Sequence, residues 1–350
     1  MVTRWTLVAA VAVGAVGCSD ALEQTSSAGQ VIAVVNSADN TVSFVSATDF
    51  SVRPVGLLST TGVPTTAAGR GTTVIVPLGP ADSVAVVRNA GLCTGLCVNP
   101  VVVLPLASGS GATGVAIQDD SIAWIANPNL NTVTRINYQT GNTSSVVVGP
   151  TPRAVAIIGG VLYVMNANLN GSTPAGASSI TWLVIGGVSP NPLPTIPLTG
   201  TNAQFAVVGD DSLLYVVDRG TPGAADGKLS IVDPAAKSEI VVINGLGESP
   251  GAAAFHPSGR LLISSLTEGI LEVYTPTRSL TLGPGNGVKP GGHGVSGVAV
   301  DLRGRVYAVD QGACAAAGTV HVLSAPPDYH EFQTVTVGVC PATAAVAATP

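Results

Sequence analysis

Few side chains in this sequence are suited to acid–base or metal chemistry. Charged residues make up 10% of the 350 residues, and there are four histidines. His256 lies in the turn-like segment FHPSGR, His321 in an apolar run and His330 in a loop near prolines, so we assign structural roles to these three. His293 lies in the glycine-rich segment KPGGHGVSGVAVD, and we expect it to point toward the central opening of the fold derived below. An acid–base catalyst also needs a positioned partner, and the sequence identifies none for His293.

The acidic residues offer one further candidate for a catalytic or metal site. Asp301 ends the apolar run that follows His293, whereas Asp119 and Asp210 stand in predicted turns. A calcium site would need carboxylates and amides that converge from several strands. We therefore predict no cofactor and no metal site. A divalent cation at the axis near His293 and Asp301 stays open as the alternative.

Several function classes leave no trace in the sequence. We find neither a glycine-rich phosphate loop between a strand and a helix nor a serine nucleophile elbow. The formal net charge is −6, and no cluster of lysine and arginine follows a strand or a loop. Because nucleic-acid binding depends on such basic clusters, we predict no nucleic-acid partner.

The elements that must position these residues are short apolar runs separated by glycine and proline. The chain contains 42 Gly and 25 Pro, and no segment after Gly17 has the 3.6-residue period of a helix. One kind of run recurs about every 40 to 53 residues and mostly ends in Asn or Asp, which start turns. These runs are 31–36, 74–78, 122–127, 162–166, 214–218, 261–266 and 306–310.

The recurrence predicts an all-β fold, a seven-bladed β-propeller with four-stranded antiparallel blades. The runs are nearly continuous Val, Ile and Ala, as expected for strands covered on both faces by neighbouring blades. The proline-rich segment 190–197 makes the fourth unit irregular, so six or eight blades stay possible. The first unit lacks an inner strand, and CPATAAVAAT at 340–349 matches the missing one. We therefore predict that the C-terminal strand closes blade one, within a single domain over residues 30–350.

The repeated units resemble the YVTN-type propeller repeats of surface proteins. The resemblance rests on VN at 35–36 with NTV at 40–42, and on AN at 126–127 with NTV at 131–133. It implies a propeller fold and a surface location, and it implies no reaction. The segment around His293 also resembles the histidine-bearing segments of propeller lyases related to the streptogramin-inactivating enzymes. That second resemblance implies acid–base and metal-associated residues at the axis.

The cysteines fit an oxidising compartment. After Cys18 four remain, an even number, and the blade scheme separates them into two pairs by rim. Cys93 and Cys97 share a loop in blade two, whereas Cys314 and Cys340 lie at the opposite rim, in blade seven and just before the closing strand. We predict the disulfides Cys93–Cys97 and Cys314–Cys340.

The N-terminal segment MVTRWTLVAAVAVGAVGC predicts export. Its apolar stretch is too short to span a membrane comfortably, so residues 1–17 are interpreted as a signal peptide. The ending AVGC resembles the lipobox of bacterial lipoproteins, which implies cleavage before Cys18 and lipidation of that residue. Residues 18–29 are small and polar, as in a flexible tether. Ser19 after Cys18 implies the outer membrane in Gram-negative lipoproteins.

The favoured interpretation is a non-enzymatic binding scaffold in the bacterial cell envelope. We expect a monomer, lipid-anchored in the outer membrane through Cys18, whose partner is a protein, a glycan or a small ligand. The alternative is an enzyme, a lyase or a lactonase-like hydrolase, with an axial site near His293 and Asp301. A polar axial pocket with several titratable groups would favour the enzyme.

Overall fold

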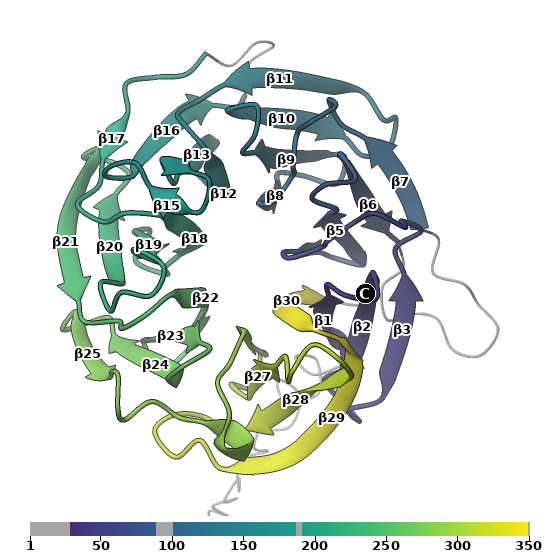
Figure 1. Ribbon diagram of the computed structural model, residues 1–350, viewed down its shortest axis with the longest axis vertical. Coiled ribbons are helices and arrows are strands. Elements are labelled where there is room, and N and C mark those ends of the chain that lie inside the picture. Colours follow the sequence, from purple (N-terminus) through teal and green to yellow (C-terminus); the bar gives the residue numbers. More distant parts are fainter. Residues whose placement is uncertain (1–28, 89–100, 187–190, 349–350) are drawn as a thin grey trace, which may run out of the picture.

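Seven four-stranded sheets surround a central axis, so the predicted all-β, seven-bladed propeller is confirmed (Figure 1). The computed structural model describes residues 29–88, 101–186 and 191–348. Neighbouring strands within each blade pair in the antiparallel sense. Within the described ranges the helical content is one 3₁₀ turn, η1 (Pro290–Gly292), and no helix there is long and apolar enough to cross a membrane.

Each blade contributes one strand to each of four concentric layers. The innermost strands, from blade one to blade seven, are β30 (Pro341–Ala348), β4 (Ala68–Arg70), β8 (Val115–Ile117), β12 (Pro152–Ile158), β18 (Ala203–Val208), β22 (Pro250–His256) and β26 (Gly297–Val300). The second strands are β1 (Gln30–Asn36), β5 (Thr73–Pro77), β9 (Ile122–Asn127), β13 (Val161–Asn166), β19 (Leu214–Asp218), β23 (Arg260–Ser265) and β27 (Val306–Asp310).

The two outer layers complete the blades. The third strands are β2 (Thr41–Ser46), β6 (Ser83–Val87), β10 (Thr132–Asn137), β16 (Ser179–Val184), β20 (Lys228–Asp233), β24 (Gly269–Tyr274) and β28 (Ala317–Leu323). The outermost strands are β3 (Val52–Gly56), β7 (Val101–Pro105), β11 (Thr143–Val147), β17 (Ile196–Pro197), β21 (Ser238–Asn244), β25 (Ser279–Leu282) and β29 (Glu331–Val339). A small hairpin, β14 (Leu169–Asn170) with β15 (Thr173–Pro174), extends blade four.

The ring closes as the sequence predicts. Strand β30 pairs with β1 along its whole length, from Gln30 opposite Ala348 to Asn36 opposite Pro341. The C-terminal strand therefore supplies the innermost strand of blade one, and the edge that β1 would otherwise expose is paired.

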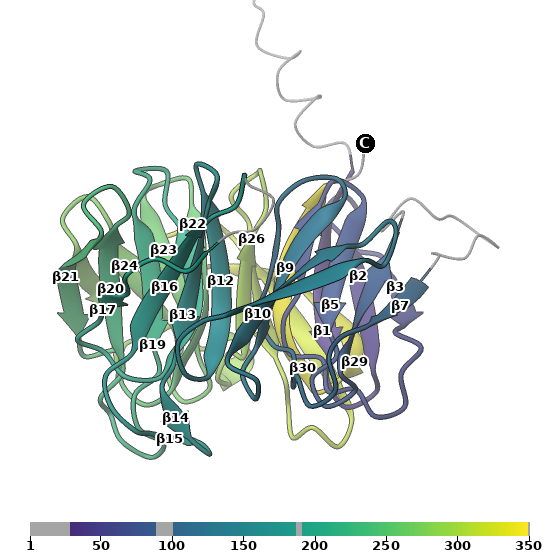
Figure 2. The ribbon, with the colours of Figure 1, turned by 90° about the horizontal axis from the view of Figure 1, so that it is seen from above.

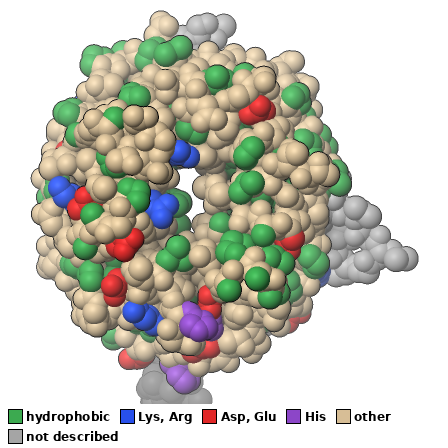
Figure 3. Space-filling model, in the orientation of Figure 1, with side chains coloured by type: hydrophobic (Ala, Val, Ile, Leu, Met, Phe, Trp, Pro, Cys, Tyr) green, Lys and Arg blue, Asp and Glu red, His purple; other side chains and the backbone are tan. Residues whose placement is uncertain are grey.

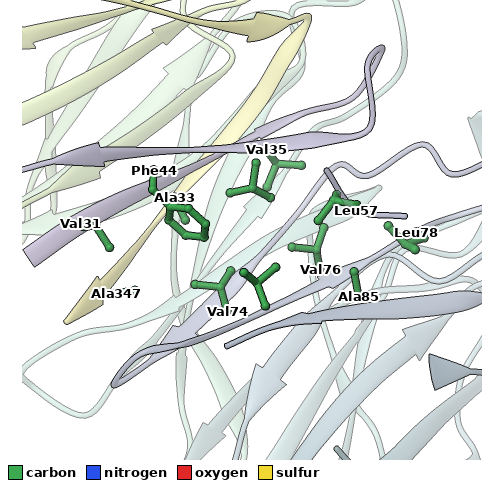
Figure 4. Packing of buried hydrophobic residues seen from close by; sticks show 12 residues of the cluster. Val31, Ala33, Val35, Phe44, Leu57, Val74, Val76, Leu78, Ala85 and Ala347 are labelled. Carbon is green, nitrogen blue, oxygen red and sulfur yellow. The ribbon is translucent and has the colours of Figure 1, made fainter. Parts of the chain in front are cut away.

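Each junction between blades is filled by its own hydrophobic cluster. Figure 4 shows the cluster between blades one and two, where Val35 and Phe44 lie opposite Val74 and Val76. Equivalent clusters fill the other six junctions. Because the second and third strands of each blade are covered on both faces, they need continuous apolar sequence.

Two rims result from the common direction of the innermost strands. We call the rim where these strands begin the front rim and the rim where they end the back rim. Second strands run the other way, so Asp310 at the end of β27 lies at the front, whereas Gln30 at the start of β1 lies at the back. Figure 2 shows the β14–β15 hairpin at the front rim and the end of β30 at the back rim.

A buried polar group recurs at the front ends of the second strands. Asn36, Asn127 and Asn166 each donate a side-chain hydrogen bond to a Ser or Thr hydroxyl on the adjacent third strand, at 2.9, 2.7 and 2.9 Å. In blade five Asp218 takes this position, and its Oδ2 accepts a hydrogen bond from Ser230 at 2.6 Å. The repeated Asn or Asp that the sequence shows is therefore a structural feature of the blades.

The disulfide Cys314–Cys340 is present, as predicted. It joins the loop after β27 to the residue before β30, so it fastens blade seven to the closing strand. For a separation of 26 residues, the chain-entropy estimate of its stabilisation is about 3.5 kcal/mol. Cys18, Cys93 and Cys97 lie outside the described residues, and their predicted modification and pairing stay predictions.

Candidate functional site

His293 has a partner that the sequence did not identify. Strands β26 and β27 are antiparallel, with Gly297 opposite Val309. This register brings the residues just before β26 to the front end of β27, where Asp310 lies. His293 Nδ1–H donates a hydrogen bond of 2.7 Å to Asp310 Oδ2. The sequence alone indicates only a turn role for Asp310, since most second strands end in Asn or Asp.

The environment of Asp310 keeps it ionised. Burial by itself would raise the pKa of Asp310. The net shift is downward, because Asp310 accepts hydrogen bonds from the Gly312 N–H and from His293 and lies near the charges of His293 and His321. The Asp310 side chain is 13% exposed, whereas that of His293 is 65% exposed. Because Nδ1–H is donated to the carboxylate, neutral His293 presents its Nε2 lone pair outward.

A second histidine continues the same chain of polar groups. His321 Nε2 lies 3.9 Å from Asp310 Oδ2, and its Nδ1–H donates to Glu331 at 2.9 Å. The His321 side chain is 8% exposed, and Nε2 has no hydrogen-bond partner among the described residues. A row of alternating acids and imidazoles thus runs from the outer strand β29 to the surface. From the sequence alone, His321 is a strand residue with a structural role.

His293 and Asp310 line a pocket of about 510 Å³ on the front rim. The other lining residues are Leu266, Gly294, Gln311, Gly312 and Ala313. The last three belong to the loop that Cys314 attaches to the closing strand. In Figure 3 histidine and acidic side chains lie together in the lower part of this face. We call this cavity the rim pocket.

The chemistry available in the rim pocket is hydrogen bonding and proton transfer through one imidazole. An exposed His whose Nδ1–H is held by a buried carboxylate is oriented to accept a proton or a hydrogen bond at Nε2. Within the described ranges no three His, Cys, Asp or Glu side chains are grouped to hold a metal ion.

The alternative axial site near His293 and Asp301 does not bring these two residues together, because they lie at opposite rims. Strand β26 ends at Val300, and Asp301 lies in the turn to β27 at the back rim. Its carboxylate accepts hydrogen bonds from the backbone N–H groups of Arg303 and Arg305, and forms a 2.6 Å ion pair with the Arg305 guanidinium. These bonds give Asp301 a structural role.

A second pocket lies between the innermost strands, and we call it the axial pocket. It is separate from the rim pocket. Its lining is mostly small and apolar, with the alanines of β12, β18, β22 and β30 and the polar residues Thr66, Arg153, Gln204 and Thr343. His293 is not part of this lining, contrary to the expectation that it faces the central opening. The described lining contains no His, Asp or Glu, so the convergent titratable groups that would favour an axial enzyme site are not found among these residues.

Solved structures share this fold. A functionally unknown protein from Desulfotomaculum acetoxidans is similar with a TM-score of 0.66 and 14% identity, over 91% of this chain and 99% of that one. Hydrazine synthase of Kuenenia stuttgartiensis gives a TM-score of 0.64 and 13% identity, over 82% of this chain and 90% of that one. A streptogramin B lyase gives 0.60 and 11%, over 81% and 95%.

At these identities the similarity establishes the propeller fold alone. No protein-family model matches the sequence, and no curated protein matches it. The class is therefore a seven-bladed β-propeller, and any function must be argued from its own pockets.

Proposed function

We propose that this protein is a binding propeller of the bacterial cell envelope, tethered at Cys18 to the outer membrane, that presents its front rim to a ligand. The observation that carries the proposal is the opposition of the two rims. Gln30, where the propeller begins, pairs with Ala348 at the back rim. The rim pocket lies at the front. A tether that runs from Cys18 through residues 18–29 enters the propeller at Gln30, so it would join the back rim to the membrane and leave the front rim open.

The size and lining of the rim pocket support recognition of a small ligand or of the exposed end of a larger one. Pockets that bind small molecules combine apolar surface with a few fixed polar groups. Here Leu266 and Ala313 supply apolar surface, and His293 supplies an oriented hydrogen-bonding group. The disulfide at Cys314 limits the motion of the loop that forms one wall.

Lipidation is tested by changing Cys18 to alanine. The wild-type chain is expected to partition into the detergent phase and the Cys18→Ala chain into the aqueous phase, because the acyl chains are lost with the thiol. Phase separation in a mild detergent, followed by immunoblotting, measures the partition. Equal partition of both chains into the aqueous phase would refute the tether without affecting the proposed pocket.

The rim pocket is tested by ligand-observed NMR on the exported chain with a library of oligosaccharide and small-molecule fragments. We expect bound fragments whose signals weaken at least tenfold in His293→Ala. The matched control is His330→Ala, which removes an exposed histidine from the loop at the back rim and should leave the signals unchanged. Equal loss in both variants, or no loss in His293→Ala, would contradict the assignment.

The hydrogen bond between His293 and Asp310, and the fold shared with a streptogramin B lyase, support a second candidate function. In this alternative His293 Nε2 acts as the general base of a lyase, and Asp310 positions the ring. Opening of a streptogramin B ring by the wild-type chain, with loss of activity in His293→Ala, would favour the lyase. Binding without turnover favours the scaffold.

A further inference from the structure

Two arginines near the front mouth of the axial pocket lack acid partners. Arg153 lies on β12 and lines the axial pocket. Arg219 follows β19 directly, and its backbone N–H donates to Asn202 O ahead of β18. Neither guanidinium has a hydrogen bond or an ion pair within the described part of the chain, and the buried Nε–H of Arg153 has no acceptor there. Figure 3 shows basic side chains beside the central opening.

Three other arginines of the described chain form ion pairs. Arg70, Arg260 and Arg305 form ion pairs of 2.8, 3.0 and 2.6 Å with Asp120, Glu272 and Asp301. A guanidinium that is partly removed from water needs an anion or acceptors to offset the lost hydration. Arg153 and Arg219 are the two described arginines whose pKa burial lowers, and neither has a counterion among the described residues.

The two guanidinium groups belong to one electrostatic site. Burial, and after it the charge of Arg219, lowers the pKa of Arg153, and burial lowers the pKa of Arg219. Their strands lie in adjacent blades, four and five. The closest acid in sequence, Asp218, turns its carboxyl toward Ser230, at 2.6 Å. Within the described residues, the repulsion between the two arginines is thus not relieved by a carboxylate.

The surrounding lining suits a small oxyanion. The axial pocket has a volume of about 160 Å³, and Thr66, Gln204 and Thr343 add neutral polar groups. The planar guanidinium matches the two oxygens of a carboxylate or a phosphate and binds them in a bidentate manner. The small side chains of Ala154, Ala206 and Ala252 leave room at the axis.

We propose that the front end of the axial pocket is a binding site for a small oxyanion, the phosphate or carboxylate group of a ligand, held by Arg153 and Arg219. This site is distinct from the rim pocket, and its test does not depend on the lipid tether or on His293. An anion between the two guanidinium groups would offset their mutual repulsion and supply an acceptor for the buried Nε–H of Arg153.

Isothermal titration with inorganic phosphate and with succinate, in chloride buffer at constant ionic strength, tests the proposal. We expect saturable binding of at least one anion by the wild-type chain, weakened at least tenfold in Arg153→Gln and in Arg219→Gln. The matched control is Arg303→Gln, which removes an exposed positive charge at the back rim and should change the affinity less than twofold. Tighter binding of one anion by tenfold would identify the preferred group.

A stability measurement keeps the test decisive if a variant folds poorly. The unfolding midpoint of the wild-type chain should rise with phosphate or succinate, whereas that of Arg153→Gln should not. Without added anion, Arg153→Gln should unfold no earlier than the wild-type chain, because it relieves a repulsion. Absence of saturable binding of both anions, binding that survives both glutamine variants, or equal weakening in Arg303→Gln would overturn the proposal.

Discussion

Asp218→Asn is expected to raise the free energy of unfolding above pH 7, by as much as about 4 kcal/mol, while changing it little at pH 4. Asp218 is fully buried, and burial raises its pKa from 3.8 to about 7, with the charge of Glu239 as a lesser cause. The hydrogen bond from Ser230 and the charge of Lys228 act in the opposite direction. Asparagine carries no charge to bury.

The sign of the pH dependence follows from the raised pKa. Folded protein keeps the Asp218 proton up to about pH 7, whereas the unfolded chain releases it near pH 4. The stabilisation by the protonated form is therefore complete below pH 4 and is lost as the pH rises toward 7. Each pKa unit corresponds to about 1.4 kcal/mol, which gives the expected size over three units.

The fold itself supports asparagine at this position. Asn36, Asn127 and Asn166 occupy the equivalent site in blades one, three and four, and each donates to a hydroxyl on the third strand. In Asp218→Asn the new side-chain N–H group can donate to Ser230 in the same way. The variant thus removes the buried charge and keeps the polar contact.

Urea unfolding followed by circular dichroism between pH 4 and pH 8 measures this effect. Asp328→Asn, at an exposed position of the loop between β28 and β29, is the matched control and should shift stability by a small, constant amount. A difference between wild type and Asp218→Asn that stays the same at pH 4 and pH 8 would show that Asp218 does not titrate in this range.

The sequence predicted the fold far better than the site, and the reason is physical. Strands β9, β13 and β19 are buried on both faces, so their composition alone identifies them. The outermost strands β3, β17 and β25 were not predicted, because they are partly exposed and contain Pro, Gly or polar residues. Their pairing is determined by the blade to which they attach.

The contact between His293 and Asp310 was beyond prediction because it depends on the end of a strand. We expected Asp301 to lie near the axis together with His293. Instead β26 ends at Val300, and the backbone N–H groups of Arg303 and Arg305 donate hydrogen bonds to the Asp301 carboxylate. The register that brings Asp310 beside His293 is a property of the folded rim. Sequence patterns identify strands, but they do not show which polar ends meet.

Trp124→Ala should lower the free energy of unfolding by about 3–5 kcal/mol, the range for removing a buried aromatic side chain. Trp124 is fully buried on β9, where it packs against Val155, Leu162 and Leu183 of blade four. Its indole N–H donates to Gln118 Oε1 at 2.8 Å. Alanine would leave a cavity at the junction between two blades. Because the blades of the propeller are closely packed, they can move only a little to fill this cavity.

Two further variants separate packing from hydrogen bonding at this junction. Trp124→Phe keeps most of the ring volume and removes the donor to Gln118 Oε1, so its expected loss is about 1–3 kcal/mol. Trp182→Ala removes the same side chain from a half-buried position. Lys237 Nζ lies 4.1 Å from the centroid of the Trp182 ring, and the indole N–H donates to Pro194 O at 2.7 Å. We expect it to cost less than Trp124→Ala. Urea midpoints by circular dichroism give the comparison, and an equal loss in the two alanine variants would mean that the blade junction does not depend on Trp124.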